Sequence, residues 1–399
     1  MALFDKFAAA AGTRDMLGAL PVNPTDIVIE RVLSATEAMI GGRPTIMAGT
    51  NNYLGLTFDP ACIEAGQRAL AEAGTGTTGS RMANGTYREH LELERELAVF
   101  YDMPYAMVFS TGYSANLGSL VALLGPGDAV LLDSEAHASL FDGCRMSGAD
   151  IFRFKHNDPD GLAKRLQRLG ERARDALIVV EGLYSIRGDC APLREYAAVK
   201  REHGGYLFVD EAHSLGVYGD GGRGLVEADD VLDQVDFVVG TFSKSLGSIG
   251  GFCVSPHEVL SLFRYASRPY IFTASPCPSV IATTRAALAL IRERPELREK
   301  VWRNAEHLYA ALAALGLTLG PHVSPVIGVS FNEREVALRC WQALLDAGVY
   351  TNLILPPAAP DGGSLIRVSV TAAHSEAQVE RIATAFRDVI ARYASGCAA

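Results

Sequence analysis

The sequence predicts an α/β protein in which helices cover both faces of a mostly parallel sheet, with a smaller α+β domain at the C-terminal end. From residue 105 onward, short β-rich runs alternate with longer helical stretches, which is the rhythm of βαβ units. Several of these runs are apolar throughout, as expected for strands buried on both faces. The 399 residues, 49% hydrophobic and 21% charged, are enough to bury a large core.

The elements follow one another in a clear order. The predicted strands of the main sheet are residues 105–109, 129–133, 151–154, 176–181, 206–210 and 235–240. After Pro276 the pattern changes to helices at 279–294 and 295–315, then strands at 327–331 and 365–370 with amphipathic helices at 333–347 and 375–391. We therefore predict an N-terminal segment over 1–45, a catalytic domain over 46–275 and a small domain over 276–399.

Charge and composition exclude several classes of protein. The net charge of −10 argues against sequence-independent binding to nucleic acid or anionic lipid. The seven cysteines form no C-x-x-C pair and the nine histidines show no metal-ligand spacing, so we predict neither a disulfide framework nor a metal site. No apolar run reaches the roughly 18 residues of a membrane span, and residues 1–14 do not resemble a signal peptide. A cytoplasmic protein without an integral membrane segment is the expectation.

Two G-x-G-x-x-G matches, at Gly74–Gly79 and Gly219–Gly224, do not predict a dinucleotide site. Such a site needs a glycine-rich turn that leaves a strand and opens a helix. The first match follows a helical stretch, and the second lies in a turn-rich segment far from any βαβ start. A nicotinamide oxidoreductase is therefore disfavoured.

A lysine follows the last predicted strand of the main sheet. Thr241, Ser243 and Lys244 come directly after an apolar run and precede small residues at 247–251. A lone lysine after a strand is usually a solvated surface residue. A lysine that forms a Schiff base needs space for a planar ring and hydroxyls for a phosphate, and this segment offers both.

Two further strand ends carry polar residues that suit the same ligand. Asp210 ends an apolar strand and therefore needs a cationic partner, although the role of an ordinary helix N-cap residue is an equal alternative. His213 follows within the same turn, so it can contact the same ligand. An aspartate opposite a pyridine nitrogen keeps that nitrogen protonated. Gly112 and Tyr113 open a helix whose free N–H groups favour a phosphate, and His137 lies just beyond the next strand, where it could stack on a ring.

Together these segments resemble the pyridoxal phosphate (PLP)-dependent enzymes of fold type I, and specifically the α-oxoamine synthase family. The resemblance covers nearly the whole chain and includes Gly112-Tyr113, His137, residues 181–185, Asp210-Glu211-Ala212-His213 and Thr241-Phe242-Ser243-Lys244. Within that family the sequence is most similar to the soluble bacterial serine palmitoyltransferases, on residues 76–86, 210–214, 241–245 and 272–275. Asn51, Ala83 and the short N-terminus depart from their usual pattern, so the acyl chain and the amino acid are less firmly implied than the cofactor.

The resemblance implies a role for each site residue. Lys244 would hold PLP and act as the general base, Asp210 would face the ring nitrogen, His137 would stack on the ring and contact the substrate carboxylate, and His213, with Ser185 as a weaker candidate, would hydrogen-bond the ring hydroxyl. Gly112, Tyr113, Thr241, Ser243 and, from a second subunit, Thr273 would bind the phosphate, and Glu181 belongs to the cofactor-binding set.

Arg367 has two interpretations. In an alternating strand it could be a surface residue, but residues 365–369 resemble the family's carboxylate-binding strand, which favours a bidentate clamp on the amino-acid carboxylate, with Asn52 assisting.

The implied reaction is the decarboxylating condensation of L-serine with a long-chain acyl thioester, palmitoyl-CoA or acyl carrier protein, to 3-ketosphinganine, the first step of sphingolipid synthesis. The resemblance also implies a homodimer with shared active sites. The alternative is another α-oxoamine synthase that uses glycine or alanine, of the 8-amino-7-oxononanoate synthase or 2-amino-3-ketobutyrate ligase type. A PLP aminotransferase and a PLP-binding regulatory module are more distant alternatives. The sequence leaves open whether the apolar substrate draws the enzyme to the inner membrane.

Overall fold

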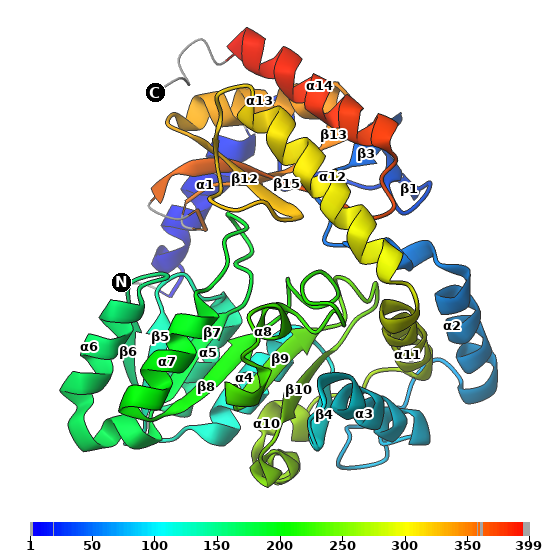
Figure 1. Ribbon diagram of the computed structural model, residues 1–399. Coiled ribbons are helices and arrows are strands. Elements are labelled where there is room, and N and C mark those ends of the chain that lie inside the picture. Colours follow the sequence, from blue (N-terminus) through cyan, green and yellow to red (C-terminus); the bar gives the residue numbers. More distant parts are fainter. Residues whose placement is uncertain (1–2, 19, 357, 360–361, 394–399) are drawn as a thin grey trace.

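A seven-stranded sheet forms the centre of the larger part of the molecule (Figure 1). The computed structural model describes residues 3–18, 20–356, 358–359 and 362–393. The strand order is β4-β10-β9-β8-β7-β5-β6, and all strands are parallel except β10, which lies antiparallel between β4 and β9. The strands are β4 (Tyr105–Phe109), β5 (Ala129–Asp133), β6 (Asp150–Phe154), β7 (Leu177–Glu181), β8 (Tyr206–Asp210), β9 (Phe237–Thr241) and β10 (Gly251–Ser255). The predicted mostly parallel sheet is confirmed.

Helices cover both faces of this sheet because successive residues of each strand face opposite sides. In β7, Leu177 and Val179 pack into one apolar cluster with α4 and α5, while Ile178 and Val180 pack into another with α3, α6 and α7. This explains why the strands are apolar throughout. The helices of this part are α3 (Arg88–Tyr101), α4 (Gly112–Leu123), α5 (Ala138–Ser147), α6 (Pro159–Leu169), α7 (Leu193–His203), α8 (Leu225–Ala228), α9 (Phe263–Ala266) and α10 (Arg268–Ile271), with 3-10 turns η3 (Gly170–Asp175), η4 (Leu232–Gln234) and η5 (Glu258–Leu262).

The smaller C-terminal domain contains an antiparallel sheet of order β11-β12-β15-β14, backed by three long helices. Its strands are β11 (Thr318–Leu319), β12 (Val326–Phe331), β14 (Asn352–Ile354) and β15 (Ser364–Ser369), and its helices are α12 (Pro295–Ala313), α13 (Arg334–Asp346) and α14 (Glu376–Tyr393). Figure 1 shows this domain above the carboxyl ends of the large sheet. It thus closes over the edge where the predicted site residues gather.

The N-terminal residues connect the two parts. Strands β1 (Arg31–Val32), β2 (Glu37–Ile40) and β3 (Arg43–Met47) form a sheet with β13 (Val349–Tyr350), so this segment lies beside the C-terminal elements. Helix α2 (Pro60–Ala73) then packs against α11 (Pro278–Glu293). The remaining elements are η1 (Asp5–Phe7), α1 (Ala8–Gly18) and η2 (Leu56–Phe58). Among the described residues, no helix combines the length and apolar character needed to cross a bilayer.

Candidate active site

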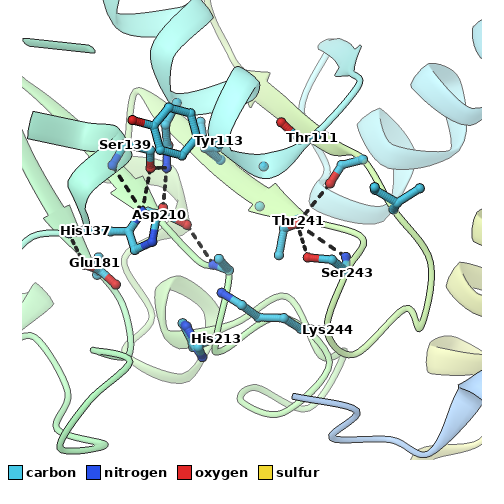
Figure 2. A pocket seen from close by; sticks show the side chains of 17 residues that line it. Thr111, Tyr113, His137, Ser139, Glu181, Asp210, His213, Thr241, Ser243 and Lys244 are labelled. Carbon is cyan, nitrogen blue, oxygen red and sulfur yellow. Dashed lines mark hydrogen bonds between the residues drawn. The ribbon is translucent and has the colours of Figure 1, made fainter. Parts of the chain in front are cut away.

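A pocket of about 300 Å³ opens at the carboxyl ends of the large sheet, where parallel sheets bind their ligands (Figure 2). Segments after five strands contribute to it: β4, β5, β7, β8 and β9. Its polar lining includes most of the residues that the sequence singled out, namely Gly112, Tyr113, His137, Glu181, Asp210, His213, Thr241, Ser243 and Lys244. Residues far apart in the chain therefore meet in one cavity.

Lys244 lies three residues beyond the end of β9, in the connection that leads back into antiparallel β10. Thr241 closes this connection, because its hydroxyl donates to the Gly250 carbonyl at 2.9 Å. In Figure 2 the amine end of Lys244 points toward Asp210 and His213. Burial lowers the pKa of Lys244 to about 8, although the negative charges of Asp210 and Glu181 act in the opposite direction. About a tenth of the amine is therefore neutral and nucleophilic at pH 7, far more than for a lysine with an unshifted pKa.

Asp210 is a buried carboxylate held by two donors. Its Oδ2 accepts from the Asn116 amide at 2.6 Å, and its Oδ1 accepts from the Ala212 N–H at 2.9 Å. The second bond closes a turn, and the next helix of the described chain begins only at Leu225, so the helix N-cap alternative is wrong. The Asp210 side chain lines the pocket. Asp210 therefore presents a fixed negative charge to a ligand.

His137 is fixed by its own helix and by a neighbouring strand. It is the N-cap of α5, and its backbone N–H donates to Glu181 Oε1 at 2.6 Å. Burial raises the pKa of Glu181 well above its usual value, and the nearby Asp210 raises it further. Glu181 thus holds the backbone of His137 in place through this hydrogen bond.

The opposite end of the pocket suits an anion. Helix α4 begins at Gly112, and the Thr111 hydroxyl caps it by accepting from the Ser114 N–H at 2.9 Å. The first N–H groups of a helix have no acceptor within the helix, so those of Gly112 and Tyr113 are available for a ligand. A Cβ on Gly112 would lie 2.7 Å from the Thr241 Cβ, so only glycine allows this close approach. The hydroxyls of Thr241 and Ser243 lie 2.9 Å apart beside it.

A second cavity adjoins the first and shares His137, His213 and Lys244 with it. Arg367, on β15, lines this second cavity, so the alternative of a surface arginine is wrong: the residue is 6% exposed. Its guanidinium donates to the Ser185 carbonyl at 2.6 Å and to Asn51 Oδ1 at 2.8 Å. Ser185 therefore orients Arg367 through its backbone, while its side chain belongs to the second cavity.

Tyr53 connects the arginine to the histidine. Arg367 Nη2 donates to the Tyr53 hydroxyl at 3.3 Å, and that hydroxyl lies 2.7 Å from His213 Nδ1. Burial, followed by the charges of Lys244 and Arg367, lowers the pKa of His213 well below its usual value. His213 is therefore neutral at pH 7, and the hydroxyl of Tyr53 can donate to its ring nitrogen.

Two of the predicted residues are not in the lining of either cavity. The Asn52 amide donates to Thr57 Oγ1 at 2.8 Å, and the preceding residue Asn51 contacts Arg367 in its place. Thr273 is half-buried between exposed neighbours, outside the pocket of its own chain. Tyr53, Asn116 and Ser139 were not predicted as site residues. A buried tyrosine, asparagine or serine carries no signal in the sequence that separates it from core packing.

A third histidine stiffens the loops that surround the site. His156 donates to Asp133 at 2.8 Å and to Asp189 at 2.5 Å, and its ring meets the Tyr184 ring edge-on. Burial alone would lower the pKa of His156, but the hydrogen bonds and charges of the two aspartates outweigh it and raise the pKa to about 10. His156 is thus a half-buried cation that ties the loop before His137 to the loop after Ser185.

The fold and the pocket define an α/β enzyme with a reactive lysine at a strand end. The aminotransferase class I and II model matches residues 44–386, and the chain belongs to that family. It is 53% identical to serine palmitoyltransferase of Caulobacter vibrioides over 98% of this chain and 96% of that protein, and 47% identical to serine palmitoyltransferase of Sphingomonas paucimobilis over 96% and 92%. A solved structure of SPT with a PLP internal aldimine superimposes with a TM-score of 0.96 at 46% identity, covering 99% of this chain and all of the other. These findings fit the α-oxoamine synthase resemblance.

Proposed function

We propose that this protein is a PLP-dependent acyltransferase that condenses L-serine with a long-chain acyl thioester, palmitoyl-CoA or acyl carrier protein, to 3-ketosphinganine. The observation that carries the proposal is the placement of Lys244 between Asp210 and Arg367, at the junction of the two cavities. The full-length similarity to serine palmitoyltransferases supports this substrate pair.

The residues of the first pocket fit PLP by their chemistry. Lys244 is half-buried and has a lowered pKa, as a group that binds an aldehyde requires. Asp210 can hold a proton on a pyridine nitrogen, and the α4 N-terminus with Thr241 and Ser243 can bind a phosphate. Bound there, PLP would supply an electron sink for negative charge at the substrate α-carbon.

The chain's own residues then divide the remaining tasks. The neutral amine of Lys244 takes the proton from the α-carbon of serine. Arg367 offers two parallel N–H groups to the serine carboxylate, after that carboxylate displaces Asn51 as an acceptor. His137 lines both cavities and would hydrogen-bond the substrate, and His213 would hydrogen-bond the ring hydroxyl of PLP. The small domain, which carries Arg367, lies above the carboxyl ends of the large sheet (Figure 1) and would limit the access of water to the reaction there.

We also propose that two chains share their active sites, with Thr273 of one chain reaching the phosphate site of its partner. Tyr113 and Ile249 line the pocket yet remain 44% and 52% exposed, and Phe272, beside Thr273, is 72% exposed. Large apolar side chains left exposed in the pocket and beside Thr273 support burial by a second copy.

We further propose domain limits at residues 45 and 275. The proposal also includes a cytoplasmic location, with or without contact with the inner membrane.

The decisive experiment incubates the purified protein and PLP with L-serine and palmitoyl-CoA and follows the products by mass spectrometry. We expect 3-ketosphinganine and one CO₂ per turnover. In Lys244→Ala we expect the turnover number to fall by a factor of about 10³ or more. Glycine and alanine serve as competing substrates in the same assay. Turnover of glycine alone would contradict the serine assignment and favour the alternative synthases. Stoichiometric formation of pyridoxamine phosphate would instead indicate an aminotransferase.

A further inference from the structure

A chain of directed hydrogen bonds runs from Asp210 to His137 through Asn116 and Ser139. The Asn116 Nδ2 group donates one hydrogen to Asp210 Oδ2 at 2.6 Å and the other to Ser139 Oγ at 2.9 Å. An ionised carboxylate only accepts, so the nitrogen of the amide, and not its oxygen, must face Asp210. Both Asn116 and Ser139 are buried, at 3% and 1% exposed, so water does not compete with these bonds. The orientation of the amide is therefore fixed.

The next link determines where His137 carries its hydrogen. Ser139 Oγ accepts from Asn116 and lies 2.7 Å from His137 Nδ1, and the Ser139 backbone N–H points to the same Nδ1 at 3.2 Å. Two donors that converge on one ring nitrogen require a lone pair there. A hydrogen on Nδ1 would face the Ser139 N–H. The ring hydrogen of neutral His137 therefore resides on Nε2.

We propose that Asn116 and Ser139 are positioning residues that hold His137 as the neutral Nε2–H tautomer, so that its ring offers the pocket a hydrogen-bond donor and not a base. This inference rests on the proposed function. It implies that the substrate group facing Nε2 is an acceptor, such as a carboxylate or carbonyl oxygen. It also leaves removal of the α-proton to Lys244.

The charges around His137 are compatible with a neutral ring. Burial is the main influence and lowers the pKa of His137. Asp210 on β8 and Asp142 on α5 raise it, whereas Lys244 beyond β9 lowers it. Glu181 on β7 accepts from the His137 backbone and not from its ring. The net direction is downward, so His137 carries no charge at pH 7.

The first test measures protonation of His137 directly in the full-length protein, by mass spectrometry of hydrogen exchange at the imidazole C2 as a function of pH. Removing the donor hydroxyl in Ser139→Ala makes the imidazolium less unfavourable, so we expect the His137 midpoint to rise by about 0.5 to 1 pH unit. Ser147→Ala is the matched control, because Ser147 also lies on α5 but bonds to Cys144. A midpoint that is equal in wild type and Ser139→Ala overturns the inference.

The second test is a double-mutant cycle at positions 139 and 137. Its readout is the Kd for serine, measured from the visible spectrum of the PLP-loaded protein. We expect Ser139→Ala to weaken serine binding about 3- to 10-fold in the wild-type background and to have no effect beyond twofold in His137→Phe. An equal loss in both backgrounds would mean that Ser139 acts only on the general structure.

A third measurement does not depend on any variant at position 139. Nitrogen NMR of ¹⁵N-histidine-labelled protein distinguishes the two tautomers, with the His137 signals assigned by their loss in His137→Phe. A hydrogen on Nδ1 refutes the inference even if Ser139→Ala does not fold. A protein that fails to bind PLP refutes the proposed function, whereas the tautomer is still measured.

Discussion

The charge on His156 predicts a specific dependence of stability on pH. The side chain is 13% exposed and bonds to Asp133 and Asp189. Its pKa of about 10 in the folded protein lies 3.5 units above the value of 6.5 for an unburied histidine. Because the folded-state pKa is raised, the stabilisation is fully present below pH 6.5 and is lost as the pH rises toward 10. At about 1.36 kcal/mol for each tenfold change in the protonation equilibrium, the stabilisation is about 5 kcal/mol at low pH and about 4 kcal/mol at pH 7, and about 3.5 kcal/mol of it is lost between pH 7 and pH 10.

The assay compares urea unfolding of wild type and His156→Asn at pH 7, 8, 9 and 10. We expect the variant to be less stable by about 4 kcal/mol at pH 7, and the difference to shrink to below about 1 kcal/mol at pH 10, where wild type also loses much of the charge. His257→Asn is the control, because His257 also pairs with a carboxylate, Asp236 at 2.8 Å, but is 40% exposed. Because the histidine of this pair is more exposed to solvent, its loss should cost less stability than the loss of His156 at pH 7. A His156→Asn difference that stays constant or widens with pH would refute the assignment of a half-buried cation.

Three further predictions concern the pocket itself. When PLP is added to the cofactor-free protein, the rate of covalent bond formation should rise with pH around a midpoint near 8, because burial lowers the pKa of Lys244 to about 8. Stopped-flow absorbance measures this rate. A rate that does not change with pH would contradict the lowered pKa. Arg367→Lys should raise the serine Kd about 10- to 100-fold in a spectral titration and leave the KM for palmitoyl-CoA unchanged, since only the bidentate contact is lost; an unchanged Kd would exclude the clamp. Tyr53→Phe should lower kcat/KM about 3- to 10-fold with the PLP spectrum retained, because His213 loses its partner, and full activity would show that the bond is dispensable.

The sequence predicted the large sheet well because burial on both faces leaves a strong local pattern. Six of its seven strands coincide with the apolar runs. Strand β10 was missed because Gly251–Ser255 follows a glycine-rich turn and has no pattern that reveals an antiparallel strand between two parallel ones. The short strands of the other sheets were missed because two or three residues carry no period.

Within the site, strand ends were predictable but partners were not. Lys244, Asp210 and His137 follow apolar runs, so their convergence at one edge follows from topology. The choice between Asn51 and Asn52 depends on their partners in the folded chain, because Asn51 accepts from Arg367 on β15 whereas Asn52 donates to Thr57. His156 meets aspartates 23 and 33 residues away in the chain, a distance at which sequence spacing carries no information.

The return of the chain from β9 to β10 has a consequence for engineering. Both ends of the connection that bears Lys244 are anchored in adjacent strands, and Ile249, near its far end, lines the same pocket. Substitutions at position 249 can therefore widen or narrow the entrance while the reactive amine keeps its place. The size of the substrate that enters can thus be changed at position 249 without changing the lysine that reacts, although both residues lie in the same short connection.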